Sequence, residues 1–284
     1  MKKQYTFVSL GYLETLGFRL GGAGLGNILF PWARAVVYAN KNSCTRIQTT
    51  WFSLKLGPIL RNENDKRFYS DLFTGYDGIS GFQKFCLVNF SDKVKFFKGI
   101  DGLFKEIIGK HNFIKRELLQ IVNPSHISAK RSYRGNGIAV HIRMGDFISS
   151  ESEKELREGK WNYRIPIRWY VSIIEKIRTI SNLPVYIFSD ANDNELNEIL
   201  CLDNCNRVFF GSAISDLLAL SESKLLITSA STFSMWASFL GQMPTIWFPG
   251  QHKQDIIFNS DVFEGELDYS DLIPDKLINF LQHD

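Results

Sequence analysis

Residues 137–248 alternate between short apolar runs rich in β-branched residues and longer stretches with helical periodicity. The apolar runs predict strands at 137–142, 184–189, 207–210, 224–228 and 244–248. Between them, helices are expected from about Pro166, near 193–200, at 213–222 and from about 232. Repeated βα units of this length favour a parallel, Rossmann-like sheet with right-handed crossovers.

The first half of the chain is less regular. The expected elements are a strand over Tyr5 to Leu10, a helix near 27–40 and a short strand at 45–49, while residues 61–110 allow no assignment. Turn-forming residues at 122–136 indicate a boundary, so two domains are expected, residues 1–128 and residues 129–284. A chain of 284 residues is long enough for two domains of ordinary size.

The composition argues against several classes of protein. A net charge of +3 is too small to indicate nucleic-acid binding, so no nucleic-acid partner is expected. No apolar stretch reaches transmembrane length, and the N-terminus leads into a strand-like run rather than a signal peptide, which favours a cytoplasmic protein. The four cysteines suggest neither a disulfide framework nor a zinc motif, and we expect idle thiols at Cys44, Cys86, Cys201 and Cys205.

The segment 137–147 is the most informative about function. It reads Gly-Ile-Ala-Val-His-Ile-Arg-Met-Gly-Asp-Phe, a predicted buried strand that delivers His141, Arg143 and Asp146 to its carboxyl end. Ligands of open α/β sheets bind at that edge, and a guanidinium beside an imidazole suits a phosphate or pyrophosphate. A structural ion pair between Arg143 and Asp146 is the alternative, and this segment alone favours neither interpretation.

A glycine-rich turn precedes the first expected helix. Residues 21–27 read Gly-Gly-Ala-Gly-Leu-Gly-Asn, and several glycines before a helix let backbone amides approach an anion. The spacing of Gly22, Gly24 and Gly26 departs from the dinucleotide fingerprint, and no Lys-Ser/Thr pair follows as in a P-loop. A tight turn formed for packing is the alternative. Asn27 is expected either to cap the helix or to reach a ligand.

A run of small hydroxyl residues follows the strand expected at 224–228. Its members are Thr228, Ser229, Ser231, Thr232 and Ser234. Hydroxyls and free amides at a helix N-terminus, outside the carboxyl end of a strand, form a second candidate anion site. Capping of the helix by Ser231 or Thr232 is the alternative. Phe233 is expected in the core or beside a nucleobase or sugar.

Three separated segments together resemble the GDP-fucose-dependent fucosyltransferase superfamily, and within it the bacterial α-1,2-fucosyltransferases of glycosyltransferase family 11. The family's Gly-x-Gly-Asn-x-x-Phe pattern is matched by residues 24–30, and its His-x-Arg-Arg-x-Asp motif by residues 141–146. Its late Asp-Leu and Ser-Ser-Phe-Ser-x-Trp segments look like residues 216–217 and 231–236. The shared order and spacing of these anchors make chance agreement improbable.

One position departs from the family motif. Met144 stands where the family has its second arginine, which removes one positive charge from the expected donor site. The related protein O-fucosyltransferases also carry an apolar residue at this place, so Met144 is compatible with transfer chemistry.

The resemblance implies a GT-B-like α/β fold, with two facing Rossmann-like domains that contain parallel sheets. The N-terminal domain is then the acceptor side, and the C-terminal domain binds the nucleotide-sugar donor. By analogy, Arg143 binds the donor diphosphate and stabilises the departing GDP. Asp216 is the implied partner of guanine N1 and N2, and Asp190 competes for guanine or ribose. The full implied donor site comprises Gly26, Asn27, His141, Arg143, Asp190, Asp216, Ser231, Thr232 and Phe233.

The implied reaction is an inverting displacement that moves fucose from GDP-fucose to a glycan hydroxyl. It needs no metal cofactor, and the sequence has no Asp-x-Asp motif on a loop after a strand. The candidate catalytic residues are Arg143, Asp146 and Glu151, with Glu153 as a further candidate for the general base. The acceptor is expected to be a glycan or a lipid-linked oligosaccharide in cell-surface polysaccharide or O-antigen synthesis. The lysine-bearing stretch 93–110 is either solvated or in peripheral contact with the inner membrane leaflet.

Three alternatives stay open at this point. One is a GT-B transferase that uses another sugar nucleotide. Another is a non-catalytic nucleotide-binding relative, in which Met144 marks lost activity. The third is a nucleotide-dependent oxidoreductase, which the glycine spacing at 21–27 disfavours.

Overall fold

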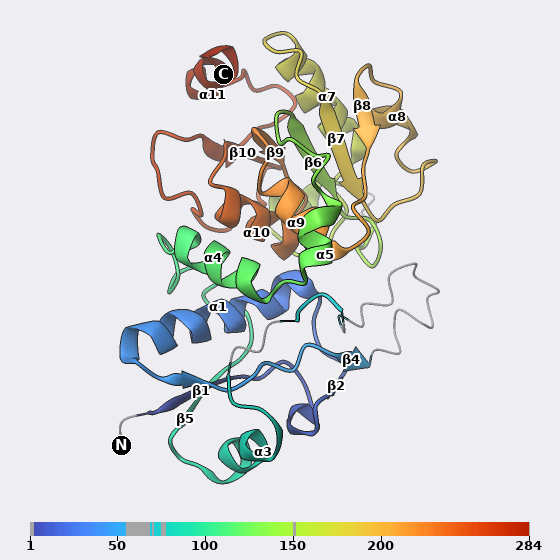
Figure 1. The fold of residues 1–284 in the computed structure, drawn as a ribbon. Helices are drawn as coiled ribbons and strands as arrows, with labels where there is room; N and C mark the ends of the chain where they lie inside the picture. The colour runs from blue at the N-terminus through green and yellow to red at the C-terminus, as the bar shows by residue number, and fades with distance from the viewer. Residues whose placement is uncertain (1–2, 55–68, 70, 75–77, 150–151, 284) are drawn as a thin grey trace. The chain divides into compact units, whose positions relative to one another are not determined.

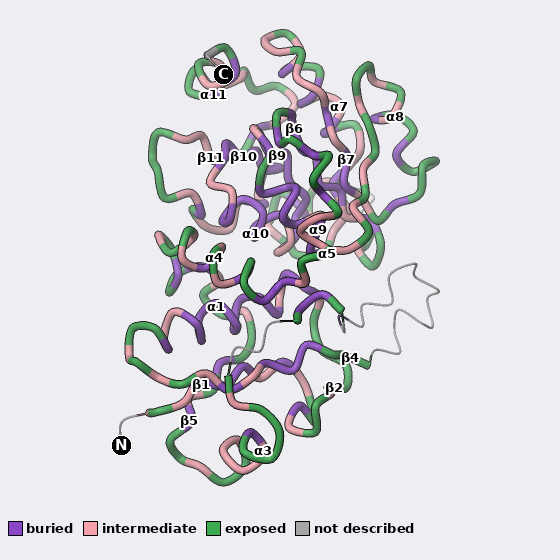
Figure 2. Tube along the Cα trace, viewed as in Figure 1, coloured by how far each residue is buried: buried purple, intermediate pink, exposed green. Residues whose placement is uncertain are grey.

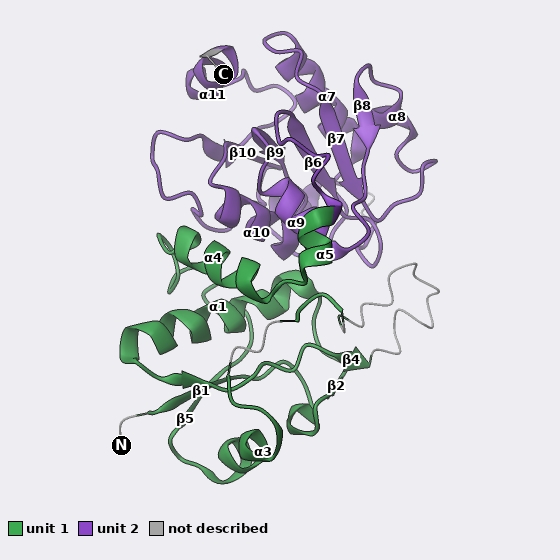
Figure 3. Cartoon of the chain, viewed as in Figure 1, with its two compact units in different colours: residues 1–128 green, residues 129–284 purple. Residues whose placement is uncertain are grey.

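The computed structural model describes residues 3–54, 69, 71–74, 78–149 and 152–283 (Figure 1). The chain divides into two compact units, residues 1–128 and residues 129–284, which are coloured separately in Figure 3. Each unit contains its own parallel sheet. Among the described residues, no helix has both the length and the apolar character needed to cross a bilayer.

Unit 2 is built on a six-stranded parallel sheet. Its strands are β6 (Ile138–Ile142), β7 (Val185–Ser189), β8 (Cys205–Arg207), β9 (Leu225–Ile227), β10 (Thr245–Trp247) and β11 (Glu264–Glu266). They are arranged in the order β11-β10-β9-β6-β7-β8, and every pairing is parallel. From β6 the chain continues through β7 to β8 on one side. It then crosses to β9 on the other side of β6 and continues through β10 to β11. This is the doubly wound order of Rossmann-type sheets, as the alternation in the sequence predicts.

Helices connect these strands or, in the case of α11, follow the last of them. They are α6 (Lys154–Arg157), α7 (Ile167–Arg178), α8 (Asn197–Leu200), α9 (Ala213–Leu220), α10 (Thr232–Gly241) and α11 (Asp275–His283). α7 packs against α8, and α9 packs against α10. Because right-handed crossovers on the two sides of β6 run in opposite directions, these two helix pairs cover opposite faces of the sheet.

The core of unit 2 explains why these segments form these elements. All five residues of β6 are buried, as the purple tube of Figure 2 shows, because a central parallel strand is covered on both faces. In α7 the buried positions repeat at helical spacing, so that one face meets the sheet. These positions are Trp169, Tyr170, Ile173, Ile174 and Ile177. Each fully buried isoleucine contributes about 1.5–3 kcal/mol.

The edge strands of unit 2 differ from the sequence prediction. The strand expected at 207–210 is instead β8, Cys205–Arg207, and its residues are mostly exposed. Phe209, which suggested the strand, is 70% exposed. An edge strand is held by backbone pairing to a single neighbour, here β7, so its side chains need no apolar pattern. The short edge strand β11 was missed for the same reason.

Unit 1 has a smaller sheet. Its strands are β1 (Tyr5–Val8), β2 (Arg19–Leu20), β3 (Thr45–Arg46), β4 (Ser53–Leu54) and β5 (Val94–Phe97). Three of them form a parallel sheet in the order β3-β1-β5, and β2 pairs with β4 in parallel. The helices are η1 (Glu14–Leu16), α1 (Leu25–Asn42), α3 (Gly81–Phe90), α4 (His111–Ile121) and α5 (Pro124–Ala129), and the last residue of α5 is the first residue of unit 2.

Candidate donor site in unit 2

The order of the strands marks one place in unit 2 as a binding site. β6 lies between β7 and β9, and the direction of winding reverses between β6 and β9. At such a switch point the connections leave the sheet on opposite faces, which opens a crevice at the carboxyl ends of the strands. His141 lies at the end of β6, Asp190 directly follows β7, and the hydroxyl-rich run follows β9.

His141 links β6 to the segment after β9. Its Nδ1 lies 2.7 Å from Oγ of Ser234 and 2.8 Å from Oγ of Ser229, and its ring centroid is 5.0 Å from that of Phe233. Burial lowers the pKa of His141 to about 4; the neighbouring Asp190 opposes the shift and Arg143 adds to it. The imidazole is therefore neutral at physiological pH and orders the switch point through hydrogen bonds rather than through charge.

The hydroxyl-rich run begins helix α10. Ser231 is the N-cap residue, and its side chain accepts the N–H of Ser234 at 3.3 Å, so the capping interpretation is confirmed for Ser231. Ser229 Oγ lies 2.9 Å from Ser231 Oγ, which ties the cap to the His141 network. Thr232 and Phe233 are the first two residues of the helix. Their position suits an anion.

Arg143 lies next to this network and is held by two carboxylates. Its Nη2 donates to Asp146 Oδ1 at 2.5 Å, and its Nη1 donates to Asp190 Oδ2. The ion pair between Arg143 and Asp146 proposed as the structural alternative is thus present, and Asp190 joins it. The Arg143 side chain is 22% exposed, so the guanidinium lies at the surface of the sheet edge and not in the packed interior.

Two further residues shape this site and escaped the sequence prediction. Gly145 has no room for a side chain, because a Cβ there would lie 2.3 Å from Asp190 Oδ2. Arg164 donates through Nε to the carbonyls of Met144 and Phe147, both at 3.0 Å, and thereby fixes the turn that carries Arg143 and Asp146. Arg164 lies outside every motif, and its role depends on a contact across 17 to 20 residues, which no local pattern reveals.

Met144 is 7% exposed and belongs to the core of unit 2. Its backbone N–H donates to Asp190 Oδ1 at 2.8 Å, while its thioether side chain packs among apolar residues. A flexible thioether suits such a position. Met144, the residue that departs from the family motif, therefore packs in the core of unit 2.

Asp216 occupies the first turn of α9, beyond the carboxyl end of β8. Its Oδ1 accepts the N–H of Phe210 at 2.8 Å, and Oδ2 has no hydrogen-bond partner among the described residues. Burial raises the pKa of Asp216 to about 7, although the bond from Phe210 opposes this shift. The carboxyl group thus changes charge close to neutral pH and retains an oxygen for a ligand.

The candidate bases differ in their surroundings. Asp146 is 41% exposed beside Arg143, whereas Glu151 falls outside the described residues. Glu153 is bound by Arg168 at 2.8 Å, by Arg157 at 2.9 Å and by the Tyr269 hydroxyl at 2.8 Å. These bonds lower its pKa against the effect of burial. A carboxylate with three donors is a poor base, so the contacts of Glu153 indicate a structural role.

A cavity of about 330 Å³ opens beside this region. Its lining residues are Ser152, Glu153, Leu156, Arg164, Pro166, Ile167, Arg168 and Glu198. Neither Arg143 nor Asp216 is among them, so the cavity adjoins the candidate donor site without forming it.

The remaining predicted residues lie in unit 1. Gly26 and Asn27 belong to the first turn of α1, after the glycine-rich turn. Gly21 and Gly22 have φ values of 67° and 98°, and a Cβ on Gly22 would meet the buried Arg19 guanidinium. Their backbone conformation and the lack of space explain these glycines by packing. A ligand-binding role for Gly26 and Asn27 stays a prediction.

Comparison with known sequences identifies a family. The sequence profile of glycosyl transferase family 11 matches residues 36–267. This range includes the His141 to Asp146 segment and the hydroxyl-rich run. No curated protein sequence matches the chain.

Solved structures share the fold. A crystal structure of NodZ α-1,6-fucosyltransferase with GDP has a TM-score of 0.50 and 14% identity, over 87% of this chain and 96% of that chain. NodZ soaked with GDP-fucose has a TM-score of 0.50 and 13% identity, over 87% and 95% of the two chains. The selenomethionine form from Bradyrhizobium gives 0.51 and 12%, over 87% and 95%. At this identity the likeness concerns the fold, and the predicted GT-B-like α/β class is confirmed.

Proposed function

Because the chain belongs to glycosyl transferase family 11, it is a glycosyltransferase, and we propose that it transfers fucose from GDP-fucose to a glycan hydroxyl through an α-1,2 linkage. The observation that carries this proposal is the arrangement at the switch point of unit 2, where Asp190 holds Arg143 just after β6 and the His141 network joins β6 to the N-terminus of α10. A cation and a helix N-terminus at the same edge of a sheet suit a diphosphate. NodZ, which shares the fold, has been crystallised with GDP and soaked with GDP-fucose.

The diphosphate would lie between α10 and Arg143. Ser231, Thr232 and the N–H group of Phe233 would hold one side of it. Arg143 has five N–H donors and directs two of them to Asp146 and Asp190, so donors remain for phosphate oxygens. Negative charge that develops on the departing GDP strengthens these bonds in the transition state, which is how they accelerate transfer.

Asp146 is the proposed general base. It is the more exposed of the two carboxylates on Arg143, at 41% against 30% for Asp190. At this exposed position the Asp146 carboxylate would accept the proton of the acceptor hydroxyl. Asp190 stays in place because its second oxygen is bound by the Met144 N–H. Asp190 therefore orients Arg143.

Guanine recognition is assigned to Asp216. An ionised carboxylate accepts two parallel hydrogen bonds from guanine N1 and N2, whereas uracil offers no such pair of donors. Asp190 is the weaker candidate for this role, because both of its oxygens already accept bonds from Arg143 and Met144. Gly26 and Asn27 of unit 1 are proposed donor-binding residues as well, as the resemblance implies.

The proposed reaction is an inverting displacement in which the acceptor oxygen attacks the anomeric carbon of fucose and GDP leaves from the opposite face. Arg143 and the α10 N-terminus would supply the positive potential that a metal ion supplies in other transferases. We therefore propose that no metal takes part in the transfer.

The proposed setting is the synthesis of cell-surface polysaccharide or O-antigen on the cytoplasmic side of the membrane, with a lipid-linked oligosaccharide as acceptor. Unit 1 carries exposed aromatic rings on and beside α3, since Phe82, Phe90 and Phe96 are 80%, 78% and 48% exposed. Lys93 and Lys98 are exposed in the same stretch. Aromatic and basic side chains together suit the surface of an anionic bilayer.

Donor specificity tests this proposal. The purified protein is incubated with GDP-fucose, GDP-mannose or UDP-galactose and a panel of glycan acceptors, and the released nucleotide is measured. Release of GDP from GDP-fucose with a fucosylated product supports the proposal. Release of UDP alone identifies a different sugar nucleotide, and GDP binding with no turnover on any glycan indicates a non-catalytic relative.

A further inference from the structure

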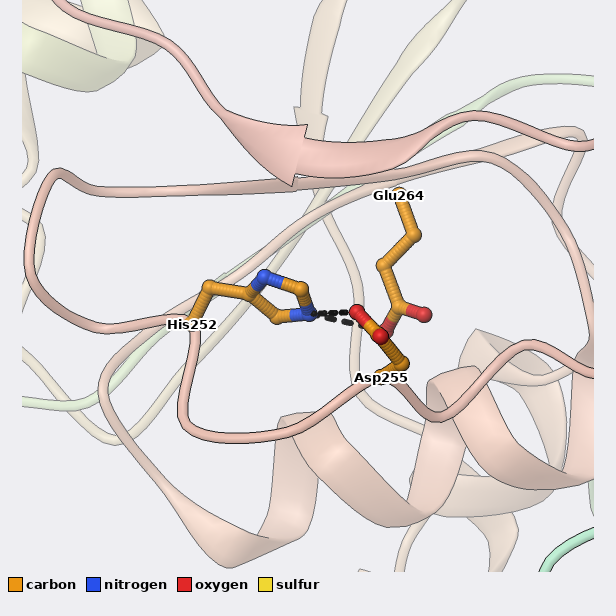
Figure 4. Close-up of side chains that lie close together, drawn as sticks. All are labelled: His252, Asp255 and Glu264. Atoms are coloured by element: carbon orange, nitrogen blue, oxygen red, sulfur yellow. Dashed lines mark ion pairs between the residues drawn. The ribbon is translucent and has the colours of Figure 1, made fainter. Parts of the chain in front are cut away.

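Three potential metal ligands lie close together at β11, an edge strand of the unit 2 sheet (Figure 4). His252 and Asp255 come from the connection between β10 and β11, residues 248–263, and Glu264 is the first residue of β11. His252 Nε2 lies 3.6 Å from Asp255 Oδ1 and 3.6 Å from Glu264 Oε1. The three ligand atoms all lie within 4.8 Å of one another.

His252 and Glu264 are part of the packed structure of unit 2, and Asp255 lies at the surface. The Glu264 side chain is only 7% exposed. Its Oε2 accepts the backbone N–H groups of Ile256 and Ile257, both at 2.8 Å, which fixes the carboxylate. Among the described residues, neither the buried Oε1 of Glu264 nor the His252 Nε2 that it faces has a hydrogen-bond partner. A buried carboxylate oxygen without a partner is costly, and its position points to a missing ligand.

We propose that His252, Asp255 and Glu264 bind a divalent transition-metal ion of the Zn²⁺ type. Imidazole and carboxylate ligands lie about 2.0–2.2 Å from Zn²⁺, so neighbouring ligands of a tetrahedral ion are about 3.4 Å apart. The two distances of 3.6 Å fit this geometry with small adjustments. One histidine with two carboxylates favours such an ion over Mg²⁺ or Ca²⁺, which prefer oxygen ligands alone. A water molecule would complete the coordination on the side of Asp255, which is 91% exposed.

The surroundings of His252 support this assignment. Its ring stacks on Trp247 with centroids 6.0 Å apart, and its backbone N–H donates to Glu266 Oε1 at 2.9 Å. The ring is thus oriented before an ion binds, as ligating histidines usually are. The ion would fasten residues 248–263 to the edge strand β11.

This site is separate from the proposed donor site. β11 and β6 are separated by β9 and β10, so three strand spacings of about 4.8 Å place them about 14 Å apart. The proposed ion is therefore structural and takes no part in the transfer.

Metal binding to the full chain tests the proposal. Protein stripped with a chelator is titrated with Zn²⁺ in a calorimeter, and Co²⁺ is added in parallel to record the visible absorption of a tetrahedral site. The variants are His252→Ala and Glu264→Gln, of which the second keeps an oxygen for the Ile256 and Ile257 N–H groups. The matched control is His126→Ala, since His126 Nε2 also lies 3.6 Å from a carboxylate, that of Asp71 in unit 1.

We expect one Zn²⁺ per chain, a rise in Tm on binding, and the same behaviour in His126→Ala. His252→Ala and Glu264→Gln should each weaken binding by more than the roughly 10- to 100-fold that changes outside the ligand set cause. Lack of binding by the native chain overturns the proposal, because the cluster is then a plain ion pair. Equal binding by the native chain and Glu264→Gln overturns it as well, because the ion then sits elsewhere.

Discussion

Arg143 and Asp190 form an ion pair that joins the ends of two neighbouring strands, β6 and β7. One oxygen of the Asp190 carboxylate accepts from the Arg143 guanidinium, and the other accepts the N–H of Met144 at 2.8 Å. The carboxylate is thus fixed by the backbone next to the side chain that it orients. The guanidinium is held at the sheet edge before any ligand arrives, and this lowers the entropic cost of binding an anion there.

The role of Arg143 predicts the effect of its removal. Arg143→Ala should lower GDP-fucose turnover by about 100- to 1,000-fold, since one donor to developing negative charge is lost. Partly exposed ion pairs contribute about 0–1 kcal/mol each, so the variant should remain folded. Nucleotide release and Tm are measured together, with Arg46→Ala as control, because Arg46 pairs with Glu117 in unit 1 at 2.7 Å. Turnover within a few-fold of the native chain would show that the assigned role is wrong.

Arg164 should act as a positioning residue. Without its bonds to the carbonyls of Met144 and Phe147, the turn that carries Arg143 is free to shift, and kcat should fall by about 10- to 100-fold while stability falls by about 1–3 kcal/mol. Arg164→Lys keeps the positive charge but lacks the planar guanidinium with its several N–H donors. Its kcat should therefore be little higher than that of Arg164→Ala.

The control for Arg164→Ala is Arg178→Ala, which removes an arginine that donates to the carbonyl of Asp203, just before the edge strand β8. If Arg164→Ala and Arg178→Ala have the same kcat, then the turn does not depend on Arg164.

Asp216 should make GDP binding dependent on pH. Its pKa of about 7 means that the carboxyl group is largely protonated at pH 6 and ionised at pH 8. Only the ionised form accepts both guanine hydrogen bonds, so GDP affinity relative to UDP should rise by about tenfold over this range. The ratio to UDP cancels the titration of the phosphates. In Asp216→Asn this ratio should be smaller and flat, and a native ratio that is flat across the range argues against guanine recognition by Asp216.

His141 should make the fold sensitive to acid. Its pKa is about 4 in the folded chain against 6.5 in the unfolded chain, so the unfolded chain binds more protons between these values. The free energy of unfolding is therefore unaffected by this group above pH 6.5. It decreases by up to about 3 kcal/mol as the pH falls from 6.5 towards 4. Denaturant unfolding of the native chain and of His141→Asn at several pH values checks this. The difference between the two should shrink in acid, and a constant difference contradicts the assignment.

A chelator should separate the two proposed sites. Transfer is assigned to Arg143 and the α10 N-terminus, so EDTA should leave kcat unchanged at temperatures well below Tm. The same treatment should lower Tm if the His252 site holds an ion. Loss of kcat in EDTA with recovery on adding Mg²⁺ or Mn²⁺ would place a metal in the transfer step.

The central part of the fold could be predicted because buried parallel strands require apolar runs. β6, β7, β9 and β10 were therefore found from composition and periodicity, and α7 from its apolar stripe. Edge elements lack this signal. β8 was placed too late because Phe209 and Phe210 are apolar, although Phe209 lies at the surface. In unit 1, α3 was missed because its apolar residues surround the helix, with Phe82 and Phe90 exposed.

The candidate site could be predicted only where local patterns mark it. The motif that contains Arg143 and the hydroxyl-rich run are continuous in sequence, and both lie at the switch point. Arg164 and Gly145 act through contacts made only after folding, so no spacing identifies them. The sequence made Glu153 a candidate for the general base, but Arg157, Arg168 and Tyr269 bind it.

The most direct test is calorimetric titration of GDP and UDP into the native chain and into Arg143→Ala, at pH 8 where Asp216 is ionised. The account predicts that GDP binds more tightly than UDP to the native chain and that Arg143→Ala weakens both, since the diphosphate is common to them. Equal affinity of the native chain and Arg143→Ala for GDP would contradict the assignment of the donor site to the end of β6.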